Sequence, residues 1–200
     1  MTTKWQIPAD MWQGETVAIL GAGPDMTEEL AANAKGFKTI ACNRAIKFAP
    51  WADMFVALDP HHPFWEEADR LEFKGMRVIG VDHPDYEALY PGMMYERVQV
   101  SPAETIEIRN NALAAIRIAY LVGANKIMLL GFDPERYEET HAHTGFRGLK
   151  QGLEQITAEL LANGVVVERI DSEKQHPGTK PLRRSEIDPA KFPQQKPKKK

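Results

Sequence analysis

The chain contains a single cysteine, Cys42, in 200 residues. One cysteine cannot form an internal disulfide, and such low usage is typical of a reducing compartment, so we expect a cytoplasmic location. No apolar run approaches the roughly 18 residues that a membrane span needs. The N-terminal stretch MTTKWQIPAD lacks the hydrophobic region of a secretory signal. We therefore expect neither a membrane span nor secretion.

Several catalytic motifs are also missing. The sequence has no G-x-S-x-G elbow, no Walker A lysine, no H-E-x-x-H and no C-x-x-C. These absences argue against the hydrolase, P-loop, zinc-protease and dithiol chemistries that depend on those motifs. A structural zinc is not expected either, because no third nitrogen or sulfur ligand lies at zinc-type spacing from His141 and His143.

Charge is divided unevenly along the chain, although its net value is only −3. The segment Lys174 to Lys200 holds nine Lys and Arg against two Asp and Glu, whereas the rest holds 16 basic and 26 acidic residues. An acidic body does not resemble a surface that binds duplex nucleic acid. The basic, proline-rich tail could contact nucleic acid, but the interpretation we favour is a solvated extension. A homo-oligomer is left open.

Apolar segments with strand character alternate with helical patterns over most of the chain. This alternation predicts an α/β protein with a single Rossmann-like, open, mainly parallel sheet and helices on both faces. We expect a loose lead-in over 1–15, one nucleotide-binding domain over 16–172 and an extended or disordered tail over 173–200. The expected strands are 16–20, 38–42, 54–58, 76–81, 97–100, 126–130 and 165–170, and the expected helices are 26–34, one within 61–73, 110–122 and 146–162.

The stretch T-V-A-I-L-G-A-G-P-D-M, residues 16–26, combines an apolar strand, a glycine turn and the start of a helix. In α/β sheets such a corner binds phosphate, since glycines allow close approach of the backbone. The match to G-x-G-x-x-G is partial, because Met26 takes the third glycine position. Asp25 followed by Glu28 predicts a capping box instead. A nucleotide site at Gly21, Gly23 and Pro24 and a plain tight turn both stay open.

Polar residues gather where the predicted strands end, which is the edge of an open α/β sheet that binds ligands. They are Asn43 and Arg44, Asp59 with His61 and His62, Asp82, Asp133, and the later His141 and His143. Either of the last two histidines could act as a general base or bind a ligand, and surface histidines are the alternative. Asp59 and Asp133 could bind Mg²⁺ with substrate phosphates, or serve as cap and loop residues.

Three asparagines are also of interest. Asn43 lies where a NAD-binding Rossmann protein would carry Asp or Glu, which argues against NAD but allows contact with a ribose or base edge. Asn110 and Asn111 open a predicted buried helix. One of this pair is expected to be the N-cap, and the other could contact a ligand.

The segments V-A-I-L-G-A-G-P-D, I-A-C-N-R and V-A-L-D-P resemble a known superfamily, as does N-N-A-L-A-A-I-R-I-A-Y-L-V-G-A-N-K-I-M-L-L-G-F-D followed by T-H-A-H. It comprises phage and prophage proteins related to 6-hydroxymethylpterin pyrophosphokinase (MptE-like) and to the motility accessory factor domain. It is more distantly similar to bacterial sialyltransferases that use CMP-sugars. The resemblance covers roughly residues 16–171. Two departures are Asp25, where the relatives carry Ser, and Ala112, where they carry Gly.

The resemblance implies that the glycine turn, Asn43 and Arg44 line a nucleotide, and that His141 or His143 is the base of a glycosyl transfer. The expected function is therefore a nucleotide-dependent transferase, glycosyltransferase-like, with a nucleotide-sugar donor and an unidentified acceptor. One alternative is a Mg²⁺-dependent pyrophosphokinase that uses ATP. Another is a non-catalytic protein that binds or sequesters a nucleotide. If the chain is phage-encoded, its expected location is the host cytoplasm.

Overall fold

A computed structural model describes residues 7–8, 10–59, 63–80, 95–98, 110–133 and 149–170. Its centre is one seven-stranded sheet in the order β5-β4-β3-β2-β1-β6-β7, and every neighbouring pair of strands is parallel. This arrangement confirms the predicted α/β class with a Rossmann-like open sheet. The strands are β1 (Thr16–Leu20), β2 (Lys38–Cys42), β3 (Met54–Val56), β4 (Met76–Gly80), β5 (Tyr95–Val98), β6 (Lys126–Leu130) and β7 (Val166–Ile170).

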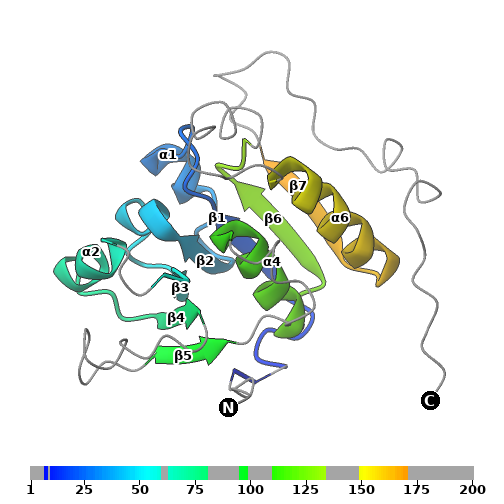
Figure 1. Ribbon diagram of the computed structural model, residues 1–200, viewed down its shortest axis with the longest axis horizontal. Coiled ribbons are helices and arrows are strands. Elements are labelled where there is room, and N and C mark those ends of the chain that lie inside the picture. The colour runs from blue at the N-terminus through cyan, green and yellow to red at the C-terminus, as the bar shows by residue number, and fades with distance from the viewer. Residues whose placement is uncertain are drawn as a thin grey trace.

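Helices cover both faces of this sheet, as Figure 1 shows. They are α1 (Glu28–Ala32), the 3-10 helix η1 (Asn43–Lys47), α2 (Phe64–Arg70), α4 (Asn111–Leu121) and α6 (Leu149–Ala162). α4 and α6 pack against each other over one face, where Arg117 of α4 forms an ion pair with Glu159 of α6 at 2.6 Å. α1, η1 and α2 lie on the opposite face.

Side chains of β1 alternate between the two faces with the period of two that a strand imposes. Val17 and Ile19 join the core beneath α4 and α6, whereas Ala18 and Leu20 join the core beneath α1, η1 and α2. All four are fully buried. A continuous apolar run is therefore what a central parallel strand needs, because neither of its faces meets water.

The lead-in is more firmly attached than the sequence predicted. Ile7 and Trp12 are buried in the core beneath α4 and α6. The backbone N–H of Trp12 donates to the Val122 carbonyl at 2.8 Å, and the backbone N–H of Gly14 donates to the Gly123 carbonyl at 2.8 Å. The described part of the lead-in thus binds the C-terminal end of α4, so the prediction of a loose segment is wrong for these residues.

The start of α1 also differs from the prediction. The N-cap is Thr27, whose Oγ1 accepts a hydrogen bond from the Leu30 N–H at 3.1 Å. Asp25 is therefore not the N-cap, and the predicted capping box with Glu28 is wrong. Met26 lies outside the helix, and its buried side chain packs next to Gly131. Because the Met26 side chain packs there, the helix begins at Glu28, two residues later than predicted.

The helix α4 follows the prediction closely. Its N-cap is Asn110, whose side-chain oxygen accepts from the Ala112 N–H at 2.8 Å. Six of its eleven residues are buried, which fits a helix that is apolar on most of its circumference. None of the helices in the described ranges is both long and apolar enough to cross a membrane.

Residues 134–148 and 171–200 lie outside the described residues. The predictions for His141, His143, the first turn of the helix expected to start at Phe146, and the basic tail fall there.

Candidate functional site

A pocket opens at the carboxyl end of the sheet, where the strand order reverses. β1 lies between β2 and β6, and the chain leaves β1 and β6 toward helices on opposite faces. Ligands in open α/β folds bind at such a switch point. The pocket contains about 440 Å³ of empty space, and this volume includes open solvent.

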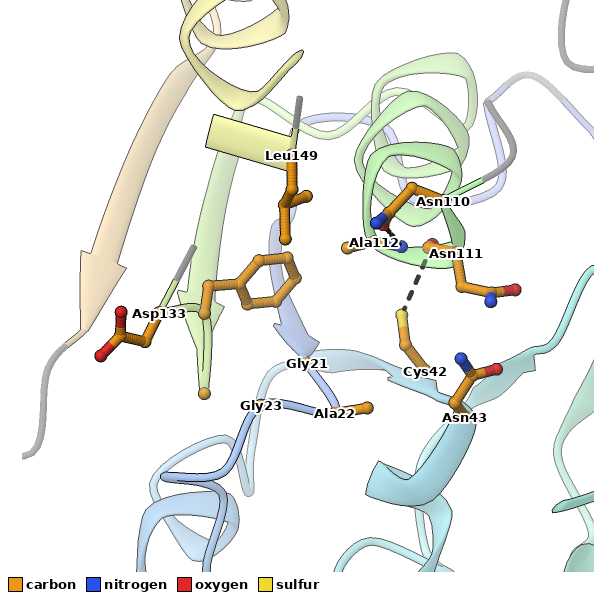
Figure 2. Close-up of a pocket in the computed structure, with 12 residues that line it drawn as sticks. Gly21, Ala22, Gly23, Cys42, Asn43, Asn110, Asn111, Ala112, Asp133 and Leu149 are labelled. Carbon is orange, nitrogen blue, oxygen red and sulfur yellow. Dashed lines mark hydrogen bonds between the residues drawn. The ribbon is translucent and has the colours of Figure 1, made fainter. Parts of the chain in front are cut away.

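Six of the residues predicted to form the site line this pocket. They come from the ends of β1, β2 and β6 and from the start of α4, and they are Gly21, Gly23, Asn43, Asn110, Asn111 and Asp133 (Figure 2). Gly21 and Asp133, the first and the last of them, lie 112 positions apart in the sequence. The sheet topology brings them together because the carboxyl ends of parallel strands share one edge.

Three other predicted residues do not line the pocket. Pro24 and Asp59 are exposed, and the Asp59 carbonyl accepts a hydrogen bond from the Trp65 indole N–H at 2.9 Å. Asp25 is half-buried at the turn that precedes α1. Asp59 therefore does not join Asp133 in the pocket, and no cluster of three or more potential metal ligands exists within the described residues.

Arg44 is predicted as a nucleotide contact, but its guanidinium turns to the protein. Its Nη2 donates to the Gly23 carbonyl at 2.8 Å, and its guanidinium carbon lies 5.7 Å from the centre of the Phe48 ring. The Arg44 side chain is therefore hydrogen-bonded to the backbone of the glycine turn. It does not line the pocket.

The glycines of the turn are required by packing between strands. A methyl group on Gly21 would lie 2.6 Å from the Gly131 oxygen and 2.8 Å from the Phe132 ring, and one on Gly23 would collide with the same oxygen. The N–H groups of Gly21 and Gly23 donate to the carbonyls of Leu130 and Gly131. The turn therefore continues the β1–β6 ladder, and these two N–H groups are not directed at a ligand.

Asn43 is the most unusual polar residue of the pocket. Its φ of 48° places it in the left-handed region, which asparagine tolerates better than most residues. Its Oδ1 is buried and has no hydrogen-bond partner, and it is the one side-chain atom in the described ranges for which this is so. A buried carbonyl without a donor is costly, and native proteins rarely keep one without a reason.

The two asparagines at the start of α4 have different tasks. Asn110 caps the helix through the Ala112 N–H. Asn111 reaches across to the end of β3, where its Oδ1 accepts a hydrogen bond from the Leu58 N–H at 2.6 Å. The prediction that one of the pair is the N-cap is confirmed, and the other fixes the position of α4 over the strand ends.

In Figure 2, Cys42 lies between Asn111 and Asn43. Its thiol faces the Asn111 carbonyl, with 3.7 Å between Sγ and O. Complete burial raises the pKa of the Cys42 thiol well above its ordinary value, so the thiolate is disfavoured and the side chain is not a nucleophile at neutral pH.

The pocket has an apolar side and a side of uncharged amides. Phe132, Leu149 and Ala112 supply apolar surface, while Asn43 and Asn111 supply amide groups. Figure 2 shows the Asp133 carboxylate directed away from both asparagines. No Lys or Arg is among the described lining residues. The described lining suits a flat, polar, uncharged group better than a bare phosphate.

Sequence reasoning missed six lining residues: Ala22, Cys42, Ala112, Gly131, Phe132 and Leu149. Four of them are direct neighbours of predicted residues at strand ends or at the start of α4. Taking the last residue of each strand and the two residues that follow it would have found Ala22, Cys42, Gly131 and Phe132. Leu149 carried no such signal, because it is set by the packing of α6.

Comparison with protein-family models gives no match, and comparison with curated protein sequences gives none.

Proposed function

We propose that this protein binds a nucleotide in the switch-point pocket and acts as a nucleotide-dependent transferase with a nucleotide-sugar donor. The observation that carries the proposal is the pocket itself, which joins the glycine turn, Asn43 and the start of α4 at the reversal of strand order. This is the part of an open α/β sheet in which nucleotides bind in proteins of this architecture.

The chemistry of the lining supports a nucleoside as the bound group. Phe132 and Leu149 offer apolar surface to the face of a base or sugar, and Asn43 and Asn111 offer hydrogen-bonding groups to its edge. Asn43 lines the pocket, and its Oδ1 has no hydrogen-bond partner within the protein. The N-terminal end of α4 at the pocket rim favours the negative charge of an attached phosphate.

In the proposed reaction the acceptor hydroxyl attacks the anomeric carbon of the donor sugar. The bond between that carbon and the phosphate oxygen breaks, and the nucleotide leaves with the bonding electron pair. His141 or His143 accepts the hydroxyl proton as general base. Asp133, which lines the pocket, is the carboxylate that we assign to positioning the donor.

The first experiment is a thermal-shift panel with CMP, UDP, GDP, ATP and NAD, each with and without Mg²⁺. A nucleotide at about 100 times its dissociation constant stabilises the protein by about 2.7 kcal/mol, which raises the Tm by several degrees. A rise with CMP or UDP that does not need Mg²⁺ supports the proposal. A rise only with ATP and Mg²⁺ would favour pyrophosphoryl transfer, and no rise with any nucleotide would contradict nucleotide binding.

Turnover is then tested with the double variant His141→Ala/His143→Ala. We expect it to keep nucleotide affinity and to lose transfer of the sugar from the matching CMP- or UDP-sugar. His176→Ala, a histidine to which we assign no role, is the matched control and should transfer at the wild-type rate. Full activity in the double variant would contradict the assigned base. Nucleotide binding by the wild type without turnover of any donor would leave a binding protein instead of an enzyme.

A further inference from the structure

One side of β6 and β7 is less completely covered than the rest of the sheet. The even-numbered residues of both strands point to the side on which α1 lies, because Met128 and Ile170 pack against the core there. The partly exposed members of this surface, which we call the β6–β7 face, are Lys126, Met128, Val166, Glu168 and Ile170. Val166 is 43% exposed and is one of three large hydrophobic residues that are exposed among the described residues. An all-parallel sheet normally has both of its faces covered.

The opposite side of the same two strands is well covered. There α6 packs against β7, as Figure 1 shows, and Ile127 and Leu129 of β6 are buried. On the β6–β7 face, by contrast, Met128 and Ile170 are only half-buried. The described part of the chain thus supplies a helical layer on one side of β7 and leaves apolar surface open on the other.

The size of this face favours a segment of the same chain over a second copy. Each strand has five residues. At about 3.3 Å per residue and about 4.8 Å between strands, the two strands cover roughly 160 Å². A stable dimer buries about 800 Å² on each partner. A tethered segment needs less contact, because its effective concentration reaches the millimolar range.

The chain continues directly from this face, since Ile170 is the last residue of β7. The large apolar residues among the 30 that follow are Leu182, Ile187 and Phe192. They lie within residues 180–192, KPLRRSEIDPAKF. Leu182 is 12 positions beyond Ile170, a reach of up to about 40 Å. This reach exceeds the roughly 17 Å length of the two strands.

Charge also favours this segment as the occupant. Residues 180–192 hold four Lys and Arg against two Asp and Glu. α1 begins beside the end of β6, because the Met26 side chain packs next to Gly131. The first turn of α1 carries Glu28 and Glu29, which are both exposed. Opposite charges of this kind guide and orient a contact more than they strengthen it.

We propose that the segment 180–192 docks on the β6–β7 face and covers it with its three large apolar side chains. Its Lys and Arg side chains then face the carboxylates at the start of α1. Docking does not need the nucleotide, so it goes beyond the proposed function and can be tested separately.

A photo-crosslinker at position 166 tests what lies on the face. Val166→p-benzoylphenylalanine is irradiated in the full chain, and the crosslinked peptides are identified by mass spectrometry. We expect crosslinks within the same chain to peptides from 180–192, with a yield that does not change on dilution. Phe37→p-benzoylphenylalanine is the matched control, because Phe37 is also 43% exposed but precedes β2, three strands from β7 in the sheet. It should give no crosslink to this segment.

The triple variant Leu182→Ser/Ile187→Ser/Phe192→Ser removes the apolar side chains and keeps every charge. We expect it to lower the crosslink yield from position 166 about tenfold or more, since each buried side chain contributes about a factor of ten. Without the crosslinker, the same variant should shift the NMR signal of the Met128 methyl group. The signal of Met54, which is fully buried in β3, should stay in place and report an intact fold. Gln194→Ser/Gln195→Ser, outside the segment, should behave as wild type.

Each of the other outcomes contradicts the proposal. Crosslinks from position 166 to a second copy, with a yield that rises with concentration, would make the face a contact between chains. Equal crosslinking from positions 37 and 166 would show an unspecific tail. A wild-type crosslink yield in the triple variant would exclude apolar docking. No crosslink from position 166 to the segment, with an unchanged Met128 signal in the triple variant, would leave the face uncovered by this chain.

Discussion

The side chain of Asn111 accepts a hydrogen bond from the backbone N–H of Leu58 at 2.6 Å, which joins the first turn of α4 to the end of β3. These two residues lie 53 positions apart in the sequence. The contact fixes the start of α4 against the strand ends and so helps to shape one wall of the pocket. It also commits the Asn111 oxygen to the protein, which determines what the amide can offer to a ligand.

Removal of this acceptor should destabilise the protein. Asn111→Ala leaves the partly buried Leu58 N–H without a partner, so we expect a loss of about 1–2 kcal/mol in the free energy of unfolding. Asn111→Asp keeps an oxygen for this N–H and places a negative charge in the first turn of α4, where it is favourable. Urea denaturation measures both variants. An equal loss in the two would contradict the role of the hydrogen bond.

The glycine turn should tolerate no side chain even without a ligand. Gly23→Ala directs its methyl group at the Gly131 carbonyl, a backbone atom that cannot move aside without disturbing the β1–β6 ladder. We expect a loss of about 1–3 kcal/mol in stability, typical of overpacking. Gly36→Asn separates crowding from backbone strain, because open space surrounds Gly36 and only its φ of +94° opposes a side chain. A stable Gly23→Ala protein that only fails to bind nucleotide would show that the glycine serves the ligand instead.

The N-cap of α1 gives a direct test of where this helix begins. Thr27→Ala removes the oxygen that accepts from the Leu30 N–H, and we expect a loss of about 1 kcal/mol in stability. Thr27→Asp retains a capping oxygen and should stay close to wild type. Thermal or urea denaturation suffices for both. If Thr27→Ala has no effect, the helix does not start at the residue seen here.

Burial of Cys42 makes stability depend on pH in the alkaline range. Burial raises the pKa of the folded thiol above its ordinary value of 9.0, so the unfolded chain loses a proton that the folded chain keeps. Below pH 9.0 the thiol is protonated in both states and the free energy of unfolding does not depend on it. Above pH 9.0 the free energy of unfolding falls by about 1.4 kcal/mol per pH unit for this one proton.

Cys42→Ala isolates this effect from other alkaline titrations. The variant should be less stable than wild type near neutral pH, because it loses buried contacts. The difference in unfolding free energy between the two proteins should then shrink between about pH 9 and pH 10.5 as the unfolded wild-type thiol ionises. Urea denaturation at several pH values gives this difference. A constant difference over that range would mean that the folded thiol ionises as readily as the unfolded one.

Much of the fold could be predicted because periodicity and burial agree in this chain. The bounds of β1, β2 and β6 match the sequence prediction, since each is a short apolar run that is followed by a turn or a polar residue. α1 was misplaced because the Asp25 and Glu28 pattern competes with Thr27, and the burial of Met26 decides between them. Single-sequence patterns do not contain that tertiary contact.

The site was predictable in its position and less so in its chemistry. The rule that ligands bind at the carboxyl ends of strands placed Asn43, Asn111 and Asp133 in one pocket. It could not show that Asn111 would be committed to Leu58, or that Arg44 would turn back to Gly23. Both outcomes depend on side-chain directions that the final packing sets.

The pairing of Thr16 with Lys126 has a consequence for how the chain folds. Among the strands of the described sheet β1 is synthesised first, yet one of its two neighbours is β6, the sixth of these strands in sequence order. Contacts so distant in sequence form slowly, because a long loop must close before they contribute. Until β6 arrives, the open edge of β1 is an exposed apolar strand that other chains can join. Fragments that end before residue 126 should therefore aggregate, and the pocket is among the last parts of the molecule to form.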